Sequence, residues 1–152
     1  MFTKAIPLGL GSLVALTLVA PTTWKATIAA TDGSRLAGSA VVEPIGTDST
    51  SATVKLTGAK AGSELAWHIH NGACGTKGPI VGPAGAYPAI RVGPDGGATS
   101  TAVLPMAPPT TGSYAVTVHK STTDLTPVAC GDLKADTSPP APAPADTTRM
   151  RP

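Results

Sequence analysis

Short segments in which apolar and polar residues alternate, separated by turns rich in Gly and Pro, constrain this fold most strongly. Between Ala52 and Leu56, for example, apolar residues occupy every second position, and Thr53 and Lys55 lie between them. This period of two is the pattern of a β-strand with one buried and one exposed face. The 17 glycines and 16 prolines supply turns and interrupt helices, so the sequence predicts an all-β protein.

Eight such segments are predicted as strands, and their spacing is typical of an antiparallel sandwich or Greek-key barrel. The predicted strands are residues 24–30, 36–44, 51–56, 64–70, 89–93, 98–104, 113–119 and 127–132. The segment 71–88 is too long for a simple turn, which makes it a candidate functional loop. A chain of 152 residues has room for one domain of ordinary size, here residues 24–133.

Both ends of the chain differ in composition from this domain. Lys4 precedes a mostly apolar run over residues 5–20, which is short for a membrane span of ~20 apolar residues. We therefore predict that residues 1–23 are a secretory signal peptide, with a retained membrane anchor as the alternative. Residues 134–152 are rich in Ala, Pro, Asp and Thr and are predicted to form a disordered or extended tail. The protein is expected to be periplasmic or secreted, with no membrane contact after signal cleavage.

The two cysteines, Cys74 and Cys130, are expected to form a disulfide bond. Cysteines of exported proteins commonly pair in an oxidising compartment. The bond would close a loop of ~56 residues, which stabilises a fold by roughly 3–4 kcal/mol in the chain-entropy model. The alternative, a metal site, is weak because neither cysteine has a partner at C-x-x-C spacing.

Two of the three histidines lie on one predicted strand, separated by a single residue. If Trp67 and Ile69 point into the core, His68 and His70 point together to the other side of the strand. Two imidazoles placed in this way can share a metal ion with a third ligand. His119, the only other histidine, ends another alternating segment and is the natural third ligand. The alternative is that all three are surface polar residues of a metal-free barrel.

Charge and motifs argue against several other classes of protein. The net charge is only +2, and residues 24–133 contain seven basic and seven acidic residues, so no nucleic-acid surface is expected. The sequence shows no Ser-His-Asp set, and the loop 71–88 lacks the spacing of a phosphate-binding loop. Cys130 has no nearby histidine, which disfavours a blue-copper electron carrier.

Four pieces of the chain resemble the Cu/Zn superoxide dismutase family, in the order in which that family has them. They are His68-Ile69-His70, Cys74-Gly75-Thr76-Lys77-Gly78-Pro79, Val116-Thr117-Val118-His119-Lys120 and Ala129-Cys130-Gly131. The turn at 94–97 also matches a hairpin of that family, and the resemblance covers most of residues 24–133. It implies an eight-stranded Greek-key β-barrel with copper on its outer face, bound by the three histidines, and a bond between the two cysteines.

Two positions depart from the pattern of the family. Ile80 stands where the family has a histidine that bridges copper and zinc, and Pro127 stands where it has an arginine that attracts superoxide. The other zinc ligands of the family should follow, yet residues 81–90 contain no His, Asp or Glu. The sequence therefore predicts no zinc site. Arg91 and Lys120 are candidates for positive charge near the metal, but their location does not follow from the sequence.

Three neutral imidazoles without a carboxylate or thiolate suit copper, and Cu(II) leads the Irving–Williams order. Zinc with a water as fourth ligand is the alternative metal. We expect one copper per chain, bound by His68, His70 and His119. Two functions remain: an exported copper carrier, buffer or store that exchanges copper with a donor or acceptor protein, and a zinc-free copper superoxide dismutase. The missing bridging histidine and arginine favour the first function, with weak or absent dismutation.

Overall fold

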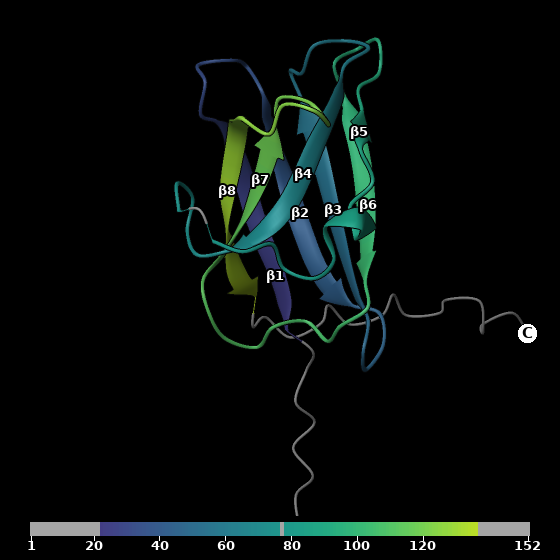
Figure 1. Ribbon diagram of the computed structural model, residues 1–152, viewed down its shortest axis with the longest axis vertical. Coiled ribbons are helices and arrows are strands. Elements are labelled where there is room, and N and C mark those ends of the chain that lie inside the picture. Colours follow the sequence, from purple (N-terminus) through teal and green to yellow (C-terminus); the bar gives the residue numbers. More distant parts are fainter. Residues whose placement is uncertain (1–21, 77, 137–152) are drawn as a thin grey trace, which may run out of the picture.

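The computed structural model describes residues 22–76 and 78–136, which form an antiparallel sheet of eight strands (Figure 1). The strands are β1 (Thr23–Ala30), β2 (Ala37–Pro44), β3 (Thr50–Thr57), β4 (Glu64–Asn71), β5 (Ile90–Arg91), β6 (Ala98–Leu104), β7 (Tyr114–His119) and β8 (Pro127–Asp136), and a short 3-10 helix, η1 (Ala84–Ala86), lies between β4 and β5. All eight predicted strands are present, which confirms the all-β prediction. Within the described residues, no helix has the length and hydropathy needed to cross a membrane. Most of the predicted signal peptide and of the predicted tail lies outside these residues.

The strand order β5-β4-β7-β8-β1-β2-β3-β6 brings distant segments of the chain side by side. Neighbouring strands all run antiparallel. The two edge strands, β5 and β6, contact each other, so the sheet closes almost completely into a barrel. Three neighbouring pairs, β1–β8, β3–β6 and β4–β7, are far apart in the sequence, as in Greek-key connections. The β4–β7 pair carries all three histidines.

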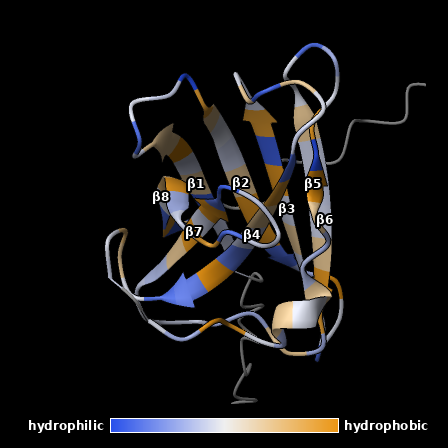
Figure 2. Cartoon of the chain, turned by 45° about the horizontal axis from the view of Figure 1, so that its top comes forward, coloured by the Kyte–Doolittle hydropathy of each residue, from blue (hydrophilic) through white to orange (hydrophobic). Residues whose placement is uncertain are grey.

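The inward faces of the strands form one apolar core. On β4, Leu65, Trp67 and Ile69 belong to it, while His68 and His70 lie half-buried on the outer face. The Trp67 side chain is 1% exposed, and its indole N–H donates to the carbonyl of Pro88 at 2.9 Å. Figure 2 shows the alternation of hydrophobic and hydrophilic residues as bands along the strands. The predicted orientation of β4 is confirmed.

The boundaries of the barrel correct the sequence analysis at both ends. β8 continues to Asp136, so residues 134–136 belong to the barrel and not to the predicted tail. Thr23, which the sequence analysis assigned to the signal peptide, begins β1 and lies opposite Asp136. Trp24 lies opposite Ala135 in the same pairing. The composition of each segment alone misses these pairs, because the backbone hydrogen bonds of a strand depend on its neighbour and not on its own side chains.

Candidate metal centre

Strands β4 and β7 bring the three histidines together on the outer face of the barrel. His119 lies opposite Ala66, and His68 lies opposite Thr117, so His119 and His68 are diagonal neighbours on the same face. On the other side of β7, the pairing with β8 has a register shift between Val118 and His119, which marks a β-bulge. One nitrogen atom from each of the three imidazoles lies within 4.8 Å of the other two. The structure therefore brings together the three residues predicted as ligands, in a group that could hold a metal ion.

Backbone carbonyls fix the orientation of two of the imidazoles. Nδ1 of His70 lies 2.8 Å from the carbonyl oxygen of Gly78, and Nδ1 of His119 lies 2.9 Å from that of Leu125. A carbonyl oxygen can only accept, so both Nδ1 atoms carry the proton and both Nε2 atoms keep a lone pair. This arrangement, in which the other ring nitrogen donates to an oxygen, is characteristic of histidines that bind metals.

The ring nitrogens that do not bond to these two carbonyls are the candidate metal ligands. Nε2 of His70 is buried and has no hydrogen-bond partner among the described residues. Nδ1 of His68 lies 3.2 Å from Nε2 of His119 and donates to it in the metal-free protein, because that Nε2 is an acceptor. A metal ion bound by Nδ1 of His68, Nε2 of His70 and Nε2 of His119 would take the place of this proton and satisfy the buried atom. The residues present therefore fit a metal ion.

The environment keeps two of the imidazoles neutral. Burial, together with repulsion from His119 and His70, lowers the pKa of His68 from 6.5 to about 4. Burial also lowers the pKa of His119, although its bond to the carbonyl of Leu125 acts in the opposite direction. Metal ions bind the neutral form of imidazole, so both side chains are in the binding form at neutral pH.

Short hydrogen bonds hold the loop that carries the carbonyl of Leu125. Oδ1 of Asp124 accepts from the backbone N–H of Thr126 at 3.1 Å and from its hydroxyl at 2.7 Å. Oγ of Ser121 accepts from the backbone N–H of Asp124 at 2.9 Å. These bonds flank Leu125 on both sides and fix the direction of its carbonyl toward His119.

The loop that carries Gly78 folds back along the end of β4. The N–H of Asn71 donates to the carbonyl of Pro79 at 2.9 Å, and His70 forms an isolated bridge with Ile80. A Cβ atom at position 78 would collide with the backbone oxygen of Asn71. Only glycine allows this approach, which brings the carbonyl of Gly78 to His70.

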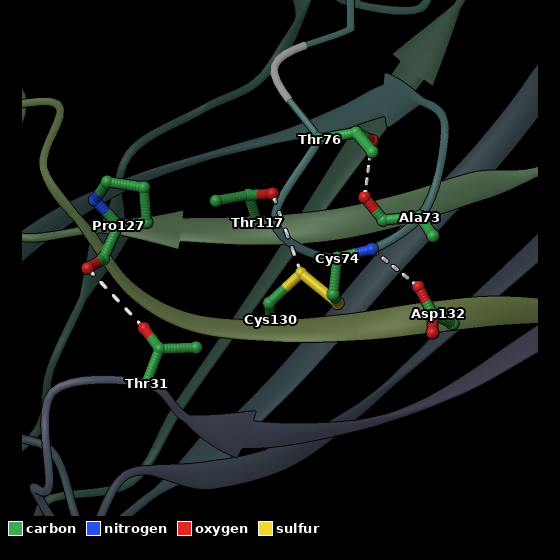
Figure 3. The surroundings of a disulfide bond; sticks show 8 residues. All are labelled: Thr31, Ala73, Cys74, Thr76, Thr117, Pro127, Cys130 and Asp132. Atoms are coloured by element: carbon green, nitrogen blue, oxygen red, sulfur yellow. Dashed lines mark hydrogen bonds between the residues drawn. A yellow bond between two sulfur atoms is a disulfide. The ribbon is translucent and has the colours of Figure 1, made fainter.

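The disulfide bond between Cys74 and Cys130 fastens this loop to β8 (Figure 3). The two Cα atoms are 5.8 Å apart, which confirms the predicted pair. The backbone N–H of Cys74 also donates to Oδ1 of Asp132 at 2.7 Å. On β7, Oγ1 of Thr117 lies 3.8 Å from Sγ of Cys130. The bond thus connects the loop that orients His70 to the same sheet that carries the other two histidines.

The imidazoles line an open cleft of about 870 Å³. Its other lining residues include the apolar side chains of Ile80, Leu125 and Pro127, and several threonines. Among the described residues that line it, Asp124 is the only aspartate, glutamate, lysine or arginine. Neither Ile80 nor Pro127 can bind a metal ion or attract an anion.

The two candidate cations do not line the cleft. Nε of Arg91 lies 3.5 Å from Oε2 of Glu64, and Nζ of Lys120 lies 3.3 Å from Oδ2 of Asp124. Both are largely exposed ion pairs, in which each cation is partly neutralised. The described part of the cleft therefore has no free positive charge next to the histidines.

Sequence reasoning found the histidines and cysteines but missed the carbonyl partners at Gly78 and Leu125. Backbone oxygens carry no side-chain signal. The nearest signals are the glycine at position 78 and the Ser121, Asp124 and Thr126 side chains, which favour a tight turn. No model of a known protein family matches this chain, and no curated protein matches it.

Proposed function

We propose that this chain is an exported copper-binding protein, a carrier, buffer or store, built on a Cu/Zn superoxide dismutase-like barrel without a zinc site. The observation that carries the proposal is the group of three imidazole nitrogens within 4.8 Å, two of them oriented by backbone carbonyls. The four pieces of sequence that resemble the Cu/Zn superoxide dismutase family also lie close together in the fold, since the Cys74–Cys130 bond and the three histidines border the same cleft.

The donor set supports copper over zinc as the bound metal. It consists of nitrogen atoms alone, and such a site binds Cu(II) more tightly than Zn(II) in the Irving–Williams order. Asp124, the one carboxylate in the described lining, is engaged with Thr126 and Lys120. Among the described residues, the histidine cluster is the only group of three or more candidate ligands, which supports a single metal site.

A zinc-free copper dismutase is the second candidate function, and the open cleft over the histidines is the observation in its favour. A small oxidant could reach a metal ion there. The described lining opposes efficient turnover, because Ile80 and Pro127 replace the groups that would handle a proton and attract an anion. We therefore assign binding as the function and treat dismutation as a secondary activity of low rate.

Metal analysis and competition measurements test the proposal. Protein isolated from its native compartment should contain one copper per chain, and metal-free protein should take up copper in preference to zinc from an equimolar mixture. Changes in outer-shell partners typically lower metal affinity roughly 10- to 100-fold. The His119→Ala variant loses a ligand itself, so its copper affinity should fall by more than this range.

Thr53→Ala provides a matched control, since Thr53 lies on β3, away from the cleft lining, with its hydroxyl 2.9 Å from that of Thr101. Its copper affinity should equal that of the wild type. Unchanged copper affinity in His119→Ala would contradict the ligand assignment, and preferential uptake of zinc would contradict the choice of metal.

A further inference from the structure

We infer that the cleft over the histidines receives a methionine side chain of the protein that exchanges copper with this site. The inference rests on the proposed function and adds the chemistry of the partner. The thioether sulfur would complete the donor set during exchange, and the apolar part of the methionine would lie against the apolar wall of the cleft.

The donor set is incomplete and open on one side. The three histidines supply one nitrogen each, which leaves a bound metal ion open to a further donor on the side of the cleft. The histidines line a cleft of about 870 Å³, which is far larger than a single water molecule needs. Its described lining supplies no fourth side chain with a free soft or nitrogen donor, because Cys130 is bonded to Cys74. A donor from outside the described lining can therefore reach a metal ion in this cleft.

The apolar walls of the cleft favour an apolar side chain from a partner. Ile80, Leu125 and Pro127 line it, and the Leu125 side chain is 56% exposed. The hydrogen bonds of Asp124 hold the backbone on both sides of Leu125, so this leucine stands at a fixed position on the cleft. An exposed leucine on a hydrogen-bonded turn beside a ligand site is a surface that a partner can cover without ordering a loop.

The charged side chains in and around the cleft favour a neutral donor atom from the partner. Asp124 is the only aspartate, glutamate, lysine or arginine of the described lining, and it is negative. Arg91 and Lys120 do not line the cleft, and they pair with Glu64 and with Asp124. Within the described lining, no lysine or arginine adds to the charge of a bound copper ion, and the carboxylate of Asp124 would repel an anionic donor from a partner.

Two neutral donors remain, imidazole and thioether, and the apolar wall favours the second. An imidazole that binds a metal keeps an N–H group that needs a partner, whereas a thioether has no such requirement. Thioether sulfur is also a soft ligand that selects Cu(I), and a methionine side chain adapts to irregular apolar surfaces.

The test uses the full-length protein loaded with Cu(I) under anaerobic conditions and short neutral peptides with blocked ends. One peptide contains methionine, a second contains norleucine at the same position, and a third contains histidine. The methionine peptide should bind at least about tenfold more tightly than the norleucine peptide, measured by calorimetry, and should show no such preference with metal-free protein.

The Leu125→Ser variant should weaken binding of the methionine peptide several-fold. Val103→Ser is the matched control, because Val103 is also 56% exposed but lies on β6, away from the cleft lining. Each variant is saturated with Cu(I) before the peptide is added, so that a change in copper affinity does not enter the comparison.

Three outcomes would overturn the inference and leave the proposed function in place. The methionine and norleucine peptides could bind equally, or the histidine peptide could bind more tightly than the methionine peptide. The third outcome is an equal effect of the Leu125→Ser and Val103→Ser variants. Failure of the protein to take up Cu(I) would also overturn the inference, and failure to take up copper in either oxidation state would overturn the proposed function with it.

Discussion

Removal of the disulfide bond should lower both the stability of the barrel and its affinity for copper. The change is the double variant Cys74→Ser with Cys130→Ser, which keeps the size of both side chains close to that of cysteine. The bond joins residues 56 positions apart. In the chain-entropy model, a crosslink that closes a loop of this length raises the free energy of the unfolded state by about 4 kcal/mol. The double variant lacks this crosslink, so its free energy of unfolding should be lower by about the same amount. Small domains have a free energy of unfolding of roughly 5–15 kcal/mol, so this loss is a large fraction of the total.

Urea unfolding of the metal-free proteins measures the first effect. At a slope of roughly 2 kcal/mol/M, the midpoint of the double variant should fall by about 2 M. Ala73→Ser, a change at an exposed neighbour of Cys74 in the same loop, should leave the midpoint in place. Equal midpoints for the double variant and the wild type would refute the loop-closure reasoning.

The second effect reaches the metal through Gly78. Without the bond, the loop is held only by contacts such as the N–H of Asn71 on the carbonyl of Pro79, and the carbonyl of Gly78 is less firmly placed against His70. Loss of an outer-shell partner typically lowers metal affinity roughly 10- to 100-fold, and we expect the lower part of this range. Competition with a chelator at fixed pH, in the absence of urea, measures this change in copper affinity. Unchanged copper affinity would mean that the loop holds itself without the disulfide.

Two further predictions concern pH and catalysis. Because burial lowers the pKa of His68 from 6.5 to about 4, the unfolded chain binds a proton in this interval that the folded metal-free protein does not, so stability should fall as pH decreases from 6.5 to about 4. Urea midpoints across this window check the sign, and a constant midpoint in wild type and His68→Gln alike would contradict it. Copper-loaded protein should consume superoxide well below the ~10⁸–10⁹ M⁻¹s⁻¹ of diffusion-limited enzymes, as pulse radiolysis can measure. Pro127→Arg should at most raise this low rate modestly and make it more sensitive to salt, whereas a near-diffusional rate abolished by His68→Ala would establish a zinc-independent dismutase.

The alternation of side chains was sufficient to predict the fold because each strand has one buried face. In β3, Ala52, Val54 and Leu56 are buried and the residues between them are not, as the period of two requires. Two of the features that escaped prediction depend on neighbours in space. The last residues of β8 are strand because β1 pairs with them, and Lys120 lies outside the cleft lining because the turn after His119 gives it a partner in Asp124.

The candidate site was predictable in its side chains but not in its chemistry. The sequence places His68 and His70 on one face, yet it does not say which nitrogen of each ring is free. That choice is made by carbonyl oxygens from two loops, at Gly78 and Leu125, whose positions depend on the disulfide and on the turn around Asp124. The ligand atoms therefore follow from tertiary structure, and a sequence pattern alone cannot supply them.

The same arrangement supports the proposal that this site binds a metal ion and does not act as an efficient enzyme. Reduction of superoxide to peroxide requires protons, and a donor must stand beside the metal in its protonated form. Hydrogen bonds from Thr126, together with Lys120, lower the pKa of Asp124, so this carboxyl is ionised at neutral pH and cannot donate. Ile80, which lies beside His70, has no proton to give. The described cleft thus provides three imidazole nitrogens, two of them on rings oriented by backbone carbonyls, and hydroxyl groups as its other side-chain proton donors.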